Sequence, residues 1–220
     1  SEGFATYFTH LYNEFVYGRD RLREGMIRDR GIVLDFHARR PDLALVPTQL
    51  TDPNEMLNPN AYQKGGWLLH MLRHRVGDDA FWEGIREYYR RYRDLNARTE
   101  DFRRVMEEAS GQDLEWFFRQ WAYRPGHPVL RGRWSYDASS DSVTVTVRQI
   151  QESGHPFRFS LDIGLVGENG EVGRVETLEI TGREHTFRFP ETGNGASLGG
   201  PRALILDPWI RLLFEGSVEG

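Results

Sequence analysis

The spacing of hydrophobic residues changes once along this chain of 220 residues, close to Gly126, and this change limits the possible folds most. Before it, hydrophobic residues recur at intervals of three and four, as on one face of a helix. After it, they alternate with polar residues, as in strands with one buried face. The sequence therefore predicts an α+β chain of two domains, a helical one over 1–126 and a strand-rich one over 127–220.

The first domain carries a series of helical patterns separated by glycine, proline and capping residues. They predict helices at 4–16, 20–39, 60–76, 78–93, 99–110 and 113–121. In the first of these the hydrophobic side chains are expected to face inward: Phe4, Phe8, Leu11, Tyr12 and Phe15. The segment 42–60 holds three prolines and little periodicity, and we expect it to be a loop that lines a cleft.

The second domain shows roughly seven short alternating segments separated by turn residues, which is typical of a β-sandwich. Asn169-Gly170 is a good candidate for a hairpin turn. The residues Ala203 to Leu206 are expected to form a buried strand, and Arg211 to Phe214 the strand that closes the sheet.

Composition excludes several classes of protein. The net charge is −5, with acidic and basic residues mixed, so we expect no basic face for nucleic acid. No apolar run approaches the roughly 20 residues that span a bilayer. The chain has no cysteine, which excludes disulfides and thiolate metal sites. The compartment stays open, with a lean toward an exported bacterial protein, since such proteins often lack cysteine as well.

Two adjacent glycines, Gly65 and Gly66, stand near the start of an expected helix. Each costs about 1 kcal/mol relative to alanine in a helix. Such a cost is usually retained where another backbone or a ligand comes close. Tyr62, one turn earlier, would then lie next to the backbone or ligand that approaches the glycines.

Two motifs resemble the zinc aminopeptidases of the aminopeptidase N family, gluzincins that include the leukotriene hydrolases. Tyr62-Gln63-Lys64-Gly65 resembles the family's Tyr-x-Lys-Gly helix, and Glu2-Gly3-Phe4-Ala5 resembles its Asn-Glu-Gly-Phe-Ala segment. The resemblance implies that Tyr62 is catalytic and donates its hydroxyl to the tetrahedral intermediate. It also implies that Glu2 is the third zinc ligand, after His-Glu-x-x-His. Without it, Glu2 is a solvent-facing acid and Tyr62 a packed aromatic.

The resemblance implies a C-terminal fragment that begins at the third zinc ligand. Its fold would be the helical part of a thermolysin-like catalytic domain followed by a β-sandwich. The parent would be a zinc metallopeptidase that removes N-terminal residues from peptides. The chain has neither His-Glu-x-x-His nor Gly-x-Met-Glu-Asn, so we expect the fragment alone to be inactive and not to bind Zn²⁺ tightly. The alternative is a catalytically dead relative that acts as a scaffold or protein-binding module.

His70 and His74 have the spacing of two zinc ligands on one helix face. However, Met71 occupies the place of a general-base glutamate, and the flanking Arg73 and Arg75 disfavour a cation. We therefore interpret the two histidines as a partly exposed or packed imidazole pair.

Overall fold

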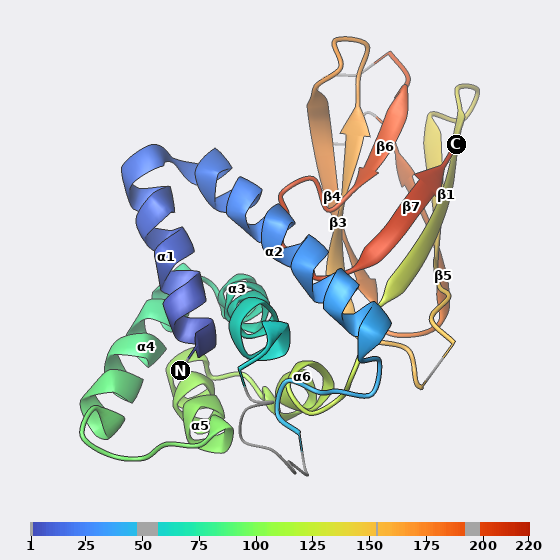
Figure 1. The fold of residues 1–220 in the computed structure, drawn as a ribbon. Helices are drawn as coiled ribbons and strands as arrows, with labels where there is room; N and C mark the ends of the chain where they lie inside the picture. The colour runs from blue at the N-terminus through green and yellow to red at the C-terminus, as the bar shows by residue number, and fades with distance from the viewer. Residues whose placement is uncertain (1, 48–56, 153, 192–198) are drawn as a thin grey trace. The chain divides into compact units, whose positions relative to one another are not determined.

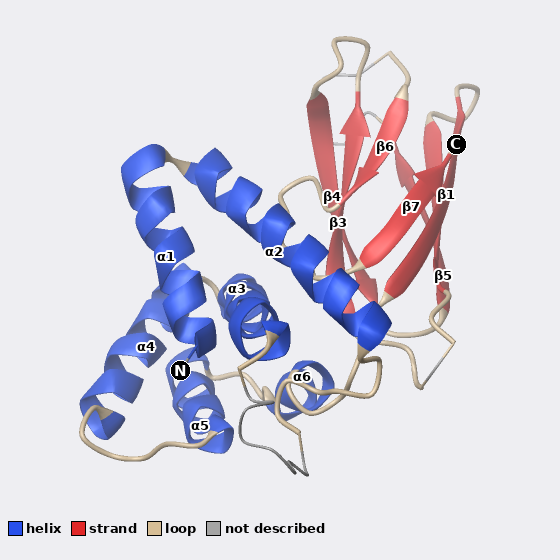
Figure 2. Cartoon of the chain, in the orientation of Figure 1, coloured by secondary structure: helices blue, strands red, loops and turns tan. Residues whose placement is uncertain are grey.

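The computed structural model describes residues 2–47, 57–152, 154–191 and 199–220. The chain divides into two compact units, Ser1–Gly126 and His127–Gly220. In the described residues the first unit contains helices and the second contains strands (Figures 1 and 2). No helix among these residues is long and apolar enough to cross a bilayer. That these units are two separate domains stays a prediction.

The helices of the first unit lie within about two residues of the expected segments. In chain order they are α1 (Glu2–Tyr17), α2 (Arg19–Arg39), a π-helical turn η2 (Asn60–Lys64), α3 (Gly65–Val76), α4 (Asp78–Tyr92), α5 (Thr99–Ser110) and α6 (Glu115–Trp121). The sequence predicted one helix from residue 60, whereas the structure begins it with a π-helical turn. The apolar run that marked the helix starts at Trp67, after this turn, so its periodicity does not reveal the wider turn.

The glycines near the start of α3 are explained by a close crossing with α1. A Cβ atom added to Gly65 would lie 2.9 Å from the Cα of Gly3, and one added to Gly3 would lie 2.7 Å from the Cα of Gly65. Gly66 faces the Thr6 side chain, where a Cβ would meet the methyl group at 3.3 Å. The prediction that another backbone approaches the glycine pair is therefore confirmed.

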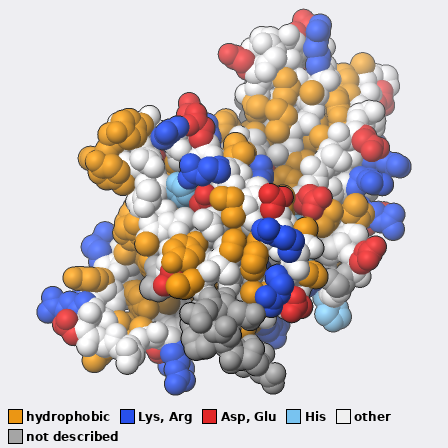
Figure 3. All heavy atoms as spheres, in the orientation of Figure 1, with side chains coloured by type: hydrophobic (Ala, Val, Ile, Leu, Met, Phe, Trp, Pro, Cys, Tyr) orange, Lys and Arg blue, Asp and Glu red, His pale blue; other side chains and the backbone are white. Residues whose placement is uncertain are grey.

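The expected inward face of α1 is only partly right. Leu11 is buried as expected, but Phe8, Tyr12 and Phe15 are 39%, 63% and 89% exposed, and the other buried residues are Gly3, Tyr7 and His10. The glycine crossing decides the orientation, because it turns the side of the helix that carries Gly3 toward α3. Figure 3 shows a hydrophobic cluster at the corner between α1 and α2, where Phe15, Val16 and Tyr17 are exposed.

The second unit is built of two sheets, as expected for a β-sandwich. Its strands are β1 (Val129–Asp137), β2 (Ser142–Gln149), β3 (Phe159–Val166), β4 (Val172–Ile180), β5 (Glu184–Pro190), β6 (Ala203–Leu206) and β7 (Glu215–Glu219). One sheet has the order β5-β2-β1-β7 and the other β4-β3-β6. Neighbours are antiparallel except β1 and β7, which are parallel. The fold class read from the sequence is confirmed.

Alternation predicted the buried side of these strands well, but the last segments differ. The side chains of Val143, Val145 and Val147 are fully buried, and Asn169-Gly170 lies in the turn between β3 and β4. In β6, however, Leu204 is buried while Ala203 and Ile205 are exposed.

The closing strand is β7, not the expected segment 211–214. The Asp207 carboxylate accepts hydrogen bonds from the backbone amides of Arg211 (2.7 Å) and Leu212 (3.0 Å). These bonds hold the segment in a capped turn, so its apolar side chains are buried outside any strand.

We predict that Gly65→Ala destabilises the helical unit, because the new methyl would meet backbone atoms that cannot rotate away. Overpacking of this kind costs about 1–3 kcal/mol or more. Gly31→Ala is the matched control: Gly31 lies within α2 with open space around its Cα. This control should be neutral or stabilising by about 0.5–1 kcal/mol, as expected for alanine in a helix. Urea unfolding followed by helical circular dichroism measures both, and equal effects would contradict the crossing.

Candidate active site

Tyr62 is displayed by the π-helical turn η2. The amide of Gly65 donates to the carbonyl of Asn60, five residues earlier, which is the bond that defines a π turn. Such turns are rare in proteins, and those that occur often lie at functional sites. The Tyr62 side chain is 36% exposed, whereas Asn60 and Lys64 on the same turn are almost fully buried. The side chain of Tyr62 therefore points outward, while the buried side chains of Asn60 and Lys64 lie on the opposite side of the turn.

Two polar side chains anchor this turn to distant parts of the helical unit. The Asn60 Nδ2 donates to the carbonyl of Leu43 (2.8 Å), and the Lys64 Nζ donates to the carbonyl of Gly126 (3.1 Å). At the start of the turn, Asn58 Oδ1 accepts from the amide of Asn60 at 2.7 Å. Two distant loops and a local cap thus fix the backbone that carries Tyr62.

Glu2 is the first residue of α1 and is half-buried. Its neighbour Gly3 makes the close contact with Gly65, three residues after Tyr62. The structure therefore brings the two segments that carry Glu2 and Tyr62 to the same helix crossing. An acidic side chain in the first turn of a helix is also favoured by the helix dipole.

The donor set tests whether zinc fits here. A catalytic zinc takes three protein ligands, commonly His nitrogen and carboxylate oxygen, and keeps a fourth position open. Glu2 has the right chemistry for one ligand. Among the residues that the structure describes, no cluster of three His, Cys, Asp or Glu side chains could hold a metal ion. The described residues thus fit one carboxylate arm of a zinc site, not the whole site.

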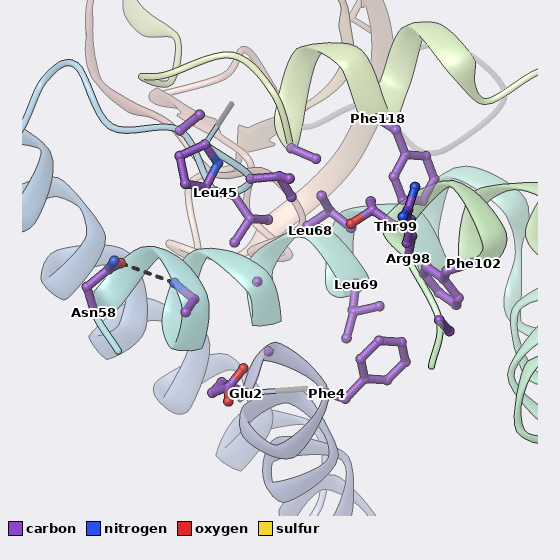
Figure 4. Close-up of a pocket in the computed structure, with 18 of the residues that line it drawn as sticks. Glu2, Phe4, Leu45, Asn58, Leu68, Leu69, Arg98, Thr99, Phe102 and Phe118 are labelled. Carbon is purple, nitrogen blue, oxygen red and sulfur yellow. Dashed lines mark hydrogen bonds between the residues drawn. The ribbon is translucent and has the colours of Figure 1, made fainter. Parts of the chain in front are cut away.

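A cavity of about 570 Å³ adjoins Glu2 (Figure 4). In this view Glu2 and Asn58 lie at one end, while Arg98, Thr99, Phe102 and Phe118 gather at the other. The wall is mainly apolar and includes Phe4, Leu68, Leu69 and Tyr88. The loop expected to line a cleft contributes 43–47 and 57–58 to this cavity. Residues 48–56 of that loop lie outside the described residues.

His70 is buried in the packing of α3, whereas His74 is exposed, so the pair is partly exposed. The hydroxyl of Tyr7 lies 3.0 Å from Nδ1 of the buried His70, and the two histidine rings are edge-to-face at 4.6 Å. Burial raises the pKa of Tyr7 well above its usual value, so its hydroxyl keeps its proton at neutral pH. This buried bond joins α1 to α3 close to the glycine crossing. The sequence did not single out Tyr7.

Lys64 belongs to the Tyr-x-Lys-Gly motif, but the sequence did not predict that its side chain is buried. It is 3% exposed, and its burial, with a smaller effect of the nearby Arg124 charge, lowers its pKa to about 8. One signal was available in the sequence: Lys64 is the only lysine among 28 Lys and Arg residues. Its burial could not be read from spacing.

The helical unit matches a known protein family. A family model described as Peptidase family M1 domain matches residues 1–121. Aminopeptidase N of Escherichia coli (strain K12) is 26% identical over 167 residues, which cover 70% of this chain and 18% of that protein. Aminopeptidase N of Lactococcus lactis subsp. lactis is 34% identical over 134 residues, 61% of this chain and 13% of that protein.

A solved structure shares the fold along the whole chain. It is the crystal structure of Legionella pneumophila aminopeptidase A in complex with aspartic acid, with a TM-score of 0.79 and 17% identity. The match covers 100% of this chain and 24% of that one. The chain thus spans less than a quarter of the length of each of these three relatives.

We predict that Lys64 makes the stability of the chain depend on pH between about 8 and 10.5. Below this window both the folded and the unfolded chain hold the proton, so the cost of burying the charge applies in full. As the pH rises through it, the folded chain releases the proton first, and the free energy of unfolding increases. The total rise attributable to Lys64 is roughly 3 kcal/mol.

Lys64→Met removes the titrating group, and the difference between the two proteins cancels the contribution of other residues. Urea unfolding across this window should show that the wild-type chain gains stability relative to Lys64→Met as the pH rises. If the free energies of unfolding of the two proteins change equally with pH, the Lys64 ammonium is hydrated in the folded chain.

Proposed function

Because the chain belongs to peptidase family M1, we propose that it is part of a zinc-dependent aminopeptidase that hydrolyses N-terminal residues from peptides. The observation that carries the proposal is the contact between Gly3 and Gly65, which places the segments of Glu2 and Tyr62 at one helix crossing. Both residues stand where the family's motifs have the third metal ligand and the catalytic tyrosine. The parent protein would supply the remaining ligands and the general base.

Glu2 would hold the metal through a carboxylate oxygen. When bound, zinc lowers the pKa of its water and polarises the scissile carbonyl. Glu2 begins α1, and the crossing at Gly3 fixes that helix end against α3. Its position is therefore set by backbone packing, not by a flexible loop.

Tyr62 would donate its hydroxyl to the oxyanion that forms when the peptide carbonyl is attacked. A donor aimed at this charge stabilises the transition state more than the bound substrate. Such a donor has to reach the substrate and to be held in place beforehand. The exposure of Tyr62 and the buried anchors Asn60 and Lys64 support both requirements.

The isolated chain should be inactive and should not bind Zn²⁺ tightly, because it supplies one ligand of three. A catalytically dead relative acting as a scaffold remains the alternative. The presence of both Glu2 and Tyr62 favours the enzyme, since a scaffold has no need for either.

We predict that Tyr62→Phe in the full-length protein lowers kcat about 100- to 1,000-fold and changes KM little. The substitution removes one hydroxyl and keeps the ring, so packing should survive. Tyr89→Phe is the control, because Tyr89 is an exposed tyrosine on α4. Steady-state kinetics on an aminoacyl-anilide, with melting curves of both variants, measure the outcome. Full activity of Tyr62→Phe would exclude the catalytic role.

We also predict that Glu2→Gln in the full-length protein weakens zinc binding by more than the roughly 10- to 100-fold typical of a residue that only supports a ligand. The amide keeps the shape of the side chain and loses its charge. Glu83→Gln, on the exposed side of α4, should retain zinc. Elemental analysis after dialysis against a chelator reports the metal directly. Equal zinc content in the two variants would sink the assignment of Glu2.

A further inference from the structure

The only lysine of the chain stands two residues after Tyr62 and is buried. All other Lys and Arg positions of the chain are arginine. Lysine is almost never fully buried unless it is paired, because its ammonium loses hydration. The one lysine of a chain that otherwise uses arginine thus lies where burial of a positive charge costs a large desolvation free energy. This placement calls for a specific reason.

The geometry around Lys64 suggests what that reason is. Its Nζ donates to the backbone carbonyl of Gly126 at 3.1 Å, a bond that spans 62 residues of sequence. Gly126 is the last residue of the helical unit and has a φ of +86°, in the left-handed region. The side chain therefore ties the turn that carries Tyr62 to the end of the helical unit.

An arginine would serve this place less well. Its planar guanidinium carries five donors and does not lose its charge in proteins. The Lys64 amine is a compact group at the end of a flexible stem, and it can donate to a carbonyl whether or not it is protonated. The positive charge of Arg124 near Lys64 also disfavours a second permanent cation.

We propose that Lys64 is the positioning residue for Tyr62: its bond to the carbonyl of Gly126 holds the π-helical turn so that the phenol stays aimed at the reacting carbonyl. Lys64 touches no substrate and acts through the backbone of η2. The inference rests on the proposed role of Tyr62. It adds that this role depends on a contact from the buried side of the turn.

The test compares Lys64→Met with Gln63→Met. Both place a methionine on η2, but Gln63 is half-buried and adjoins Tyr62 without being one of the anchors described above. In the full-length protein, Lys64→Met should lower kcat by about 10- to 100-fold with KM little changed, as expected for a misplaced catalytic group. Gln63→Met should stay within a few fold of wild type.

Hydrogen exchange on the 220-residue chain gives a readout that does not depend on activity. In Lys64→Met, the amides of 60–65 should exchange faster, while those of α5 should be unchanged. Faster exchange throughout the helical unit would mean a general scaffold role and would overturn the positioning role. So would a fully active Lys64→Met.

A failure of this inference is distinct from a failure of the proposed function. If Tyr62→Phe is inactive and Lys64→Met is active, the catalytic role stands and the positioning role falls. If Tyr62→Phe is fully active, both fall.

If Lys64→Met does not fold, the wild-type chain still tests the inference. Lysine labelled with carbon-13 gives one side-chain signal, because the chain has one lysine. A titration to the ordinary lysine value near 10.5 would place the amine in water and overturn the proposal. A midpoint well below it supports the buried bond.

Discussion

The helical unit depends on one contact, the crossing of α1 and α3 at Gly3 and Gly65. No other residue type fits at either position, since a Cβ would come within 3 Å of backbone atoms of the other helix. Glycine weakens a helix, and both positions lie at a helix end, where the loss is smaller than in the middle. The crossing turns the Gly3 side of α1 toward α3 and brings the segments that carry Glu2 and Tyr62 together.

Polar groups buried beside the crossing make it specific. The hydroxyl of Tyr7 meets His70, and farther along the same helices the Arg73 guanidinium reaches the carboxylate of Glu14 (3.0 Å). Apolar side chains alone tolerate small shifts of one helix along another. A buried hydrogen bond does not, because a shift leaves its partners unsatisfied at a cost of about 1–3 kcal/mol. These bonds therefore fix the register of α1 on α3.

The sequence predicted the elements of the fold better than their orientation. Alternation identified Val143, Val145 and Val147 as buried, because a strand has two faces and one carries the apolar residues. In α1 the same logic succeeded only for Leu11, because the glycine contact turned the helix so that most of its aromatic residues face outward. Hydrophobic spacing depends on side chains, and the residue that decided the orientation, Gly3, has none. The Tyr-x-Lys-Gly motif contains Lys64 but gave it no role, because its bond to Gly126 depends on long-range folding.

The proposed role of Tyr62 places two opposed demands on it, and the π-helical turn can meet both. A residue that donates to a substrate has to be accessible, yet exposed side chains are poorly fixed by packing. Here the fixing comes from the opposite side of the turn, where the side chains of Asn60 and Lys64 reach two separate carbonyls. Each hydrogen-bonded turn here encloses one more residue than in an α-helix, and the side of the turn opposite Tyr62 is buried. Burial of a polar anchor costs stability, but a catalytic group misplaced by about 1 Å can cost roughly 100-fold in rate.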